Sequence, residues 1–157
     1  MIRIFSQVKT YKFHHGVTLV ELLIVTSIIA ILSIIVYPSY TSYILKSYRT
    51  EALEALTKTQ LHIESLYSTR IENTPKEKYQ ALLELTIDKN KGSCLQDHIC
   101  KIDNNRYLLS YNLVSSGMSI YTLSATPQSD LGQNNDRCGT LTLNAGGVGL
   151  GNNSGCW

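Results

Sequence analysis

The sequence has few charged residues, and its first third has almost none. Charged residues make up 17% of the 157 residues and the formal net charge is +2, which excludes a highly charged disordered protein. Between Val17 and Leu45 the only charged residue is Glu21. The chain also lacks the glycine-rich pattern of a phosphate-binding loop and any supported Ser/His/Asp or Cys/His constellation. We therefore expect neither a nucleotide-binding protein nor an enzyme.

An uninterrupted apolar run follows a basic N-terminal segment. Residues 1–16 carry three basic residues and no acid, and Val17 to Tyr37 form a run of 21 residues. As a helix this run would span roughly 30 Å, the thickness of a bilayer core. No small-residue signal-peptidase site follows it. The pattern predicts a membrane-spanning helix whose basic flank stays on the cytoplasmic side.

Glu21 is an unusual residue in such a helix. A carboxylate costs a few kcal/mol in hydrocarbon unless it is paired or lies near the interface. One interpretation is that Glu21 occupies the first turns of the helix, where an acid favours the positive end of the dipole. The other is a functional pairing, which the surrounding motif favours.

The segment from Gly16 to Val25, GVTLVELLIV, resembles the N-terminal signature of type IV pilins. The resemblance implies cleavage by prepilin peptidase between Gly16 and Val17, with methylation of the new N-terminus, although Val17 replaces the commoner phenylalanine. Glu21 would be the fifth mature residue. It would pair with the ammonium group of a neighbouring subunit and set the register of the filament, because a buried ion needs a partner. Pro38 falls at the usual pilin position, and YPSY (residues 37–40) is typical of the PilE-like group.

The helix should continue well beyond the apolar run. Pro38 should weaken or kink it, but neither glycine nor proline occurs between Ser39 and Thr74. Apolar residues recur there at helical spacing, with Glu51, Glu54, Lys58 and Glu64 mostly on the outer side. We expect a helix of roughly 55 residues, about 80 Å long, that stops near Asn73. The tyrosines at 37, 40, 43 and 48 suit either an aromatic belt at the membrane interface or subunit packing in a filament.

The remainder should be a small sheet stapled by disulfides. The segments 106–113, 119–126 and 139–144 have strand patterns, and we expect polar or irregular loops at 128–135 and 146–155. Four cysteines in an exported chain indicate disulfides, with three possible pairings. We favour Cys94–Cys100 and Cys138–Cys156, because each closes a local loop, whereas C-x3-H-x-C fits a zinc site poorly. Cys138 to Cys156 also resembles the C-terminal disulfide-bounded loop of type IV pilins.

These features together predict an α+β type IV pilin fold, in which a long N-terminal helix packs on a small antiparallel β-sheet. We expect four parts. They are a leader peptide (1–16), a transmembrane and filament-core half of the helix (17–38), an amphipathic half (39–72) and a disulfide-stapled β-sheet region (73–157). We expect no cofactor and no metal.

The resemblance implies a structural subunit, most simply a PilE-like minor pilin. It would lie in the inner membrane and then in an extracellular pilus, and it would support pilus biogenesis, adhesion and twitching motility. Its implied partners are other pilin subunits, prepilin peptidase and the inner-membrane assembly platform. A major pilin and a type II secretion pseudopilin remain alternatives, although pseudopilins often have a calcium-binding loop in place of the disulfide.

A different alternative is a minor pilin that binds DNA for natural transformation. DNA binding requires clustered cations, and the candidates near the cysteine loops are Lys89, Lys91, Lys101, Arg106 and Arg137. Acids lie beside them at 88, 97, 103 and 136, and removal of the leader leaves 11 basic against 12 acidic residues. On this global balance we place the DNA receptor second to the structural subunit.

Overall fold

The computed structural model describes residues 16–71, 74–114 and 119–157. The chain forms two compact units, residues 1–39 and residues 40–157, and helix α1 (Leu19–Tyr67) contributes to both. The predicted leader lies outside the described residues apart from Gly16. The predicted boundary at 72–73, including the stop at Asn73, lies outside them as well.

The first unit is the apolar part of α1. This helix is long and apolar enough to cross a membrane, and the large apolar side chains from Val17 to Val36 are 48% to 79% exposed. The few hydroxyls bond to carbonyls of the preceding turn, as in Ser27 to Leu23 (2.7 Å) and Ser33 to Ile29 (2.7 Å). These bonds satisfy polar groups that would be costly in an apolar environment. The helix assignment is continuous through Pro38.

The second half of α1 supplies one side of the core of the second unit. Its buried residues are Arg49, Ala52, Ala55, Leu56, Thr59 and Ile63, which follow the helical repeat. The helix begins at Leu19 and ends at Tyr67, before the predicted stop near Asn73, so it has 49 residues instead of roughly 55. The amide and hydroxyl of Thr69 both bond to the carbonyl of Leu66, which closes the helix with a tighter turn.

A second helix follows, α2 (Pro75–Thr86), which the sequence analysis did not predict. Thr74 and Glu77 form a reciprocal capping box at its start, and Pro75 occupies the first turn. Its inner face buries Tyr79, Leu82, Leu83 and Thr86. The capping box therefore fixes where α2 begins, and the buried face of α2 packs into the core.

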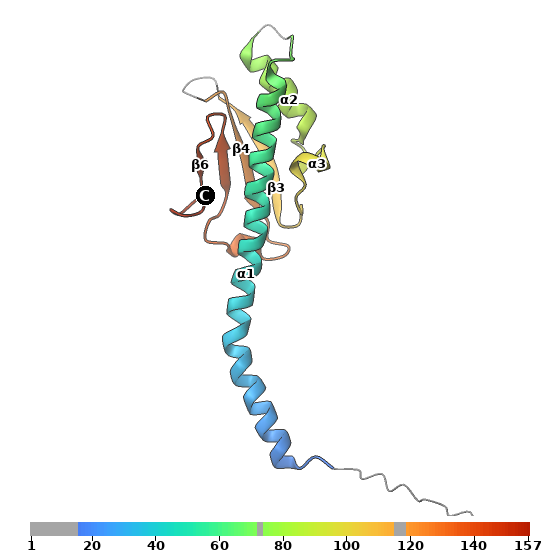
Figure 1. Cartoon of the computed structure of the whole chain (residues 1–157), viewed down its shortest axis with the longest axis vertical. Coiled ribbons are helices and arrows are strands. Elements are labelled where there is room, and N and C mark those ends of the chain that lie inside the picture. The colour runs from blue at the N-terminus through green and yellow to red at the C-terminus, as the bar shows by residue number, and fades with distance from the viewer. Residues whose placement is uncertain (1–15, 72–73, 115–118) are drawn as a thin grey trace, which may run out of the picture. The chain divides into compact units, whose positions relative to one another are not determined.

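The described residues of the second unit also form a two-stranded and a four-stranded sheet, and Figure 1 shows the larger sheet beside α1. A short antiparallel pair, β1 (Ile87–Asp88) and β2 (Ser93–Cys94), precedes the short helix α3 (Asp97–Cys100). The main sheet is antiparallel with the order β3 (Tyr107–Leu113), β4 (Tyr121–Pro127), β5 (Leu141–Asn144) and β6 (Gly149–Leu150). A 3₁₀ turn, η1 (Gln133–Asn135), lies between β4 and β5.

The central strands bury alternate residues on the face of the sheet that is covered by helices. Leu109, Leu123 and Leu143 are at most 2% exposed and belong to the same core cluster as Leu56 of α1. This alternation is what a sheet with one covered face requires. The predicted fold, a long helix packed on an antiparallel sheet, is confirmed.

Two disulfides staple this unit. Cys138 and Cys156, 18 residues apart, bracket β5 and β6, and this pairing was predicted from the sequence. Cys94 and Cys100, six residues apart, join β2 to α3. Cys138, Cys156 and Cys100 are at most 3% exposed. The covalent links therefore lie within the core.

Glu64 differs from its predicted place on the outer side of the helix. Its carboxylate accepts hydrogen bonds from the hydroxyls of Tyr79 (3.0 Å) and Tyr121 (2.8 Å). The ring of Tyr79 also stacks on Tyr67, with centroids 4.6 Å apart. Burial and the Glu64 carboxylate raise the pKa of Tyr79 to about 12 and that of Tyr121 further. This cluster ties α1, α2 and β4 together.

Candidate functional site

The residues implicated in processing lie at the start of α1. Gly16 and Val17 are exposed, and the amide of Glu21 donates to the hydroxyl of Thr18 (3.2 Å). This bond satisfies one of the free amides of the first turn. Glu21 lies in that first turn, where the helix dipole favours negative charge. Pairing of Glu21 with another subunit, and the role of Pro38 in assembly, stay predictions.

Two of the candidate cations lie on the tight turn between β1 and β2. The side chain of Asp88 accepts the amides of Asn90 (3.0 Å) and Lys91 (3.2 Å), and Gly92 adopts a positive φ of 64°. A side chain at Gly92 would meet Leu108 of β3, so the turn is held close to the sheet. Lys89 and Lys91 are both exposed, and the ammonium of Lys89 lies 5.3 Å from the ring centre of Tyr111.

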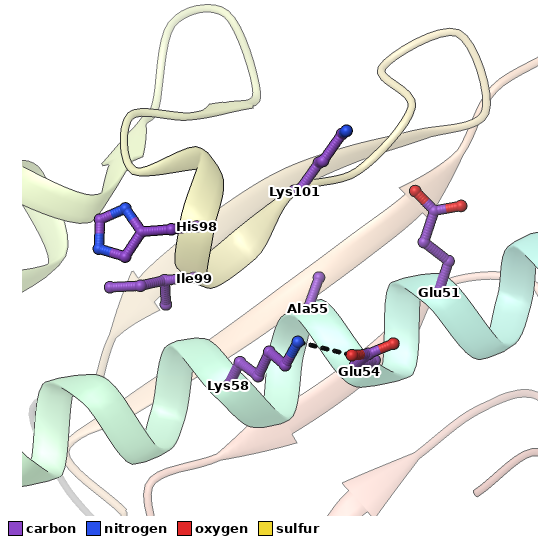
Figure 2. Close-up of a pocket in the computed structure, with 7 residues that line it drawn as sticks. All are labelled: Glu51, Glu54, Ala55, Lys58, His98, Ile99 and Lys101. Carbon is purple, nitrogen blue, oxygen red and sulfur yellow. Dashed lines mark ion pairs between the residues drawn. The ribbon is translucent and has the colours of Figure 1, made fainter.

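Lys101 follows α3 and borders a cavity of about 240 Å³ against α1 (Figure 2). The cavity is also lined by Glu51, Glu54, Lys58 and His98. Lys58 is paired with Glu54 (2.6 Å). Two carboxylates near Lys101 reduce the attraction of this cavity for an anion.

Arg106 has a structural role in this fold. Its guanidinium lies 4.3 Å from the ring centre of Tyr48, and Nη1 donates to the carbonyl of Leu131 (2.8 Å). The side chain therefore joins α1, the start of β3 and the loop after β4. An arginine already engaged by a ring and a carbonyl has less freedom to contact an external phosphate.

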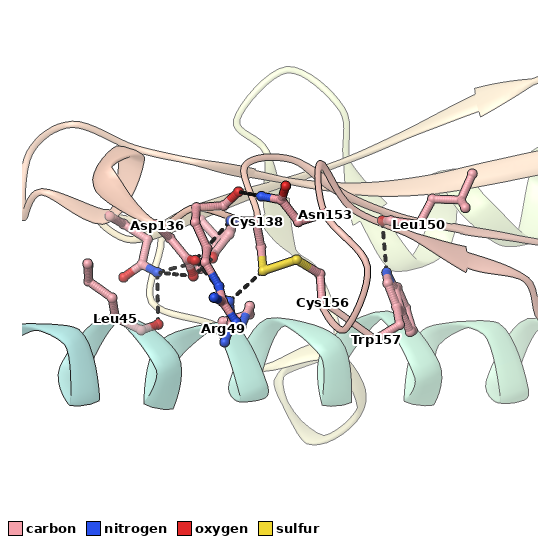
Figure 3. Close-up of a disulfide and its surroundings, with 11 residues drawn as sticks. Leu45, Arg49, Asp136, Cys138, Leu150, Asn153, Cys156 and Trp157 are labelled. Carbon is pink, nitrogen blue, oxygen red and sulfur yellow. Dashed lines mark hydrogen bonds and ion pairs between the residues drawn. A yellow bond between two sulfur atoms is a disulfide. The ribbon is translucent and has the colours of Figure 1, made fainter.

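Arg137 lies in a different environment, next to the C-terminal disulfide. It borders a cavity of about 320 Å³ together with Ser42, Leu45, Lys46, Arg49 and Asn135. Arg137 and Lys46 are exposed, while Arg49 is buried and paired with Asp136 (3.0 Å). Figure 3 shows Arg49 of α1 against Asp136 and the Cys138–Cys156 bond. The five candidates thus occupy four environments, and Arg137 shares its own with Lys46 and Arg49, two cations that the sequence analysis missed.

Several acids near these cations bond within the protein instead of projecting into solvent. Asp136 is 8% exposed and binds Arg49, and Glu64 binds two tyrosines. Asp88 and Asp103 each accept backbone amides of their own turns. Lys46, Lys91 and Arg137, by contrast, are exposed and are in no ion pair with another described residue.

No group of three or more potential ligands forms a metal site within residues 16–71, 74–114 and 119–157. The four cysteines are in disulfides, and this part of the chain has no free thiol.

Comparison with known families gives two matches. Residues 38–142 match the model described as type IV minor pilin ComP, DNA uptake sequence receptor, and residues 11–37 match the prokaryotic N-terminal methylation motif. No curated protein and no solved structure matched significantly. The family matches confirm a prepilin with an apolar N-terminal helix, and they place the chain among structural subunits rather than enzymes.

The matches also correct the ranking of functions made from the sequence. They support the DNA receptor, placed second there, better than a minor pilin with a purely structural role. The global charge balance was the wrong criterion, because binding depends on where the cations lie and on which acids are already engaged. With the methylation motif and the minor pilin model together covering residues 11–142, the chain belongs to the family described as type IV minor pilin ComP, DNA uptake sequence receptor.

Proposed function

We propose that this chain is a minor pilin that binds duplex DNA outside the cell, as a receptor in DNA uptake. The observation that carries the proposal is the family match over residues 38–142. That match spans all of the candidate cations, including Lys46, Lys91 and Arg137. Phosphate contacts by such side chains supply the sequence-independent part of DNA affinity.

Sequence recognition needs side chains that read base edges in addition to cations. Exposed asparagines lie near Arg137, with Asn134 and Asn135 in η1 and Asn152 in the disulfide-bounded loop. Asparagine can both donate to and accept from a base edge. The surface around the C-terminal disulfide therefore offers groups of both kinds, and we propose it as the DNA-binding face.

Assembly would bring this face to the cell surface. In the proposed sequence of events, the leader 1–16 is removed between Gly16 and Val17, and the segment 17–38 anchors the subunit in the inner membrane. That segment then enters the pilus core, where Glu21 pairs with the N-terminus of a neighbour. Residues 39–72 and 73–157 carry the exposed domain. The partners are other pilins, prepilin peptidase and the assembly platform.

The test uses the full chain in detergent and a random-sequence duplex library. Repeated capture and sequencing should enrich one motif, and a mismatch in that motif should weaken binding by about tenfold or more per base pair. The control is a duplex of the same composition in shuffled order. Equal binding of the enriched and shuffled duplexes, or no binding at low salt, would refute the DNA receptor.

A cellular experiment separates the receptor from a purely structural subunit. Replacing Arg137 with Gln should reduce DNA uptake while pili form in normal number, because the side chain is exposed and lies outside the core. The matched control is Lys58→Gln, an exposed cation of α1 that is paired with Glu54. Loss of pili together with loss of uptake in the Arg137 variant would favour the structural role.

A further inference from the structure

A buried ion pair joins α1 to the loop that precedes the C-terminal disulfide. Nη1 of Arg49 lies 3.0 Å from Oδ1 of Asp136, and the two side chains are 10% and 4% exposed. The same nitrogen contacts Sγ of Cys138. Because an unpaired charge at such depth is strongly unfavourable, the pair fixes the position of the loop against α1.

Asp136 is the centre of a larger buried network. It accepts the amide of Cys138 (3.0 Å), the hydroxyl of Tyr107 (3.4 Å) and Nε2 of Gln133 (3.5 Å). Gln133, which is fully buried, also donates to the carbonyl of Leu45 on α1 (3.0 Å). The Asp136 carboxylate and the Gln133 side-chain amide therefore link two turns of α1 to β3 and to the disulfide.

The network holds the backbone on both sides of Arg137. Asp136 precedes it, Cys138 follows it, and its own carbonyl accepts Nδ2 of Asn153 (2.6 Å). The side chain is nevertheless exposed. The fold thus fixes the backbone of Arg137 and leaves its guanidinium directed at solvent.

Lys46 provides a second cation at the same place. It lies three residues before Arg49 on α1, hence on the same side of the helix, and it borders the same cavity as Arg137. Neither Lys46 nor Arg137 is in an ion pair with another residue of the described part of the chain. Two unpaired cations therefore flank a concave surface of about 320 Å³.

We propose that Lys46 and Arg137 form a two-cation clamp for a DNA phosphate, and that Arg49 and Asp136 position it. This inference rests on the proposed function and assigns one phosphate subsite within it. A cation on a fixed backbone loses less freedom on binding than one on a mobile loop. The buried pair thus contributes to affinity without contacting DNA.

The clamp is tested by the salt dependence of DNA binding. The full chain in detergent is titrated with a labelled DNA duplex at about 50 to 200 mM salt, where each phosphate contact contributes about 0.9 to the log–log slope. Lys46→Gln and Arg137→Gln should each lower the slope by about 0.9. Lys58→Gln, the matched control on α1, should leave it unchanged.

The positioning role is tested by a double-mutant cycle. The combined Arg49→Met and Asp136→Asn variant removes both buried charges, which preserves folding better than removing one. This double variant should lower the salt-dependence slope by as much as Arg137→Gln does. Adding Arg137→Gln to it should then change the slope little. A full additional effect of Arg137→Gln in that background would overturn the positioning role.

A surface variant keeps the test independent of folding. Asn153→Ala releases the carbonyl of Arg137 at an exposed position, and it should weaken DNA binding only while Arg137 is present. If Asn153→Ala is silent and the slope is unchanged in Lys46→Gln and Arg137→Gln, the clamp is wrong although the DNA receptor stands. If the unmodified chain binds no duplex at low salt, both proposals fail.

Discussion

Replacing Glu64 with Ala should be among the most destabilising changes on α1. Two hydroxyls, of Tyr79 and Tyr121, donate to its carboxylate at 3.0 and 2.8 Å. Hydrogen bonds to a charged group contribute about 1.5–3 kcal/mol each, and a buried hydroxyl without a partner carries a further cost. Tyr121 is fully buried and Tyr79 is 8% exposed, so water can replace the lost acceptor only at Tyr79. We expect Glu64→Ala to lower the free energy of unfolding by about 3 kcal/mol.

The assay is chemical denaturation of the full chain in detergent, followed by near-ultraviolet circular dichroism of the tyrosines. Glu54→Ala is the matched control, because Glu54 is exposed on the same helix and its pair with Lys58 contributes at most about 0.5 kcal/mol. Glu64→Gln retains one acceptor oxygen, so its loss of unfolding free energy should lie between those of Glu64→Ala and Glu54→Ala. Equal losses of unfolding free energy for Glu64→Ala and Glu54→Ala would refute the role of the Glu64 hydrogen bonds. It would also be refuted if Tyr121→Phe cost as much stability in the Glu64→Ala background as in the unmodified chain.

Three further predictions concern the tyrosines, the disulfides and assembly. Because burial raises the pKa of Tyr79 and Tyr107 to about 12, their neutral hydroxyls stabilise the fold fully below pH ~10, the ordinary tyrosine pKa. The free energy of unfolding should then fall as pH rises towards 12, and a flat profile over that window would contradict this. Replacing both Cys138 and Cys156 with Ala should lower the free energy of unfolding by about 3 kcal/mol, against about 2 kcal/mol for Cys94 and Cys100, because the longer loop loses more entropy when closed. Equal losses of unfolding free energy in the two double cysteine variants, measured by chemical denaturation, would reject the loop-entropy explanation. Glu21→Val should reduce the amount of subunit in sheared pili at an unchanged cellular level, and normal incorporation would remove the assembly role of Glu21.

Local patterns in the sequence predicted the three longest strands, but not β1, β2 or β6, which falls in the loop expected at 146–155. β3, β4 and β5 begin within two residues of their predicted starts, because period-two alternation and bounding turn residues are local signals. Helix α2 was missed although its signals are also local, with Thr74 and Glu77 at capping-box spacing and Pro75 between them. The polar character of that segment obscured a short amphipathic stripe.

The candidate site was less predictable, because its contacts join distant parts of the chain. Arg49 and Asp136 are 87 residues apart, and Arg106 and Leu131 are 25 apart. A sequence pattern can show that an arginine lies near a cysteine, but it cannot show which cations are engaged by rings and carbonyls. For the same reason the spacing of Glu64 placed it on an outer face, while the two tyrosines that bind it come from α2 and β4.

The charge distribution explains how a nearly neutral subunit can belong to a family of DNA receptors. Residues 40–157 hold 11 basic and 11 acidic residues, so their total gives no net attraction for phosphate. Asp136 is buried against Arg49, however, while Lys46, Lys91 and Arg137 remain exposed. Within a Debye length of about 10 Å, a phosphate responds to the nearest unpaired charges and not to the total. Such a surface would give weak general attraction to DNA and a larger contribution from the few places where cations are held together.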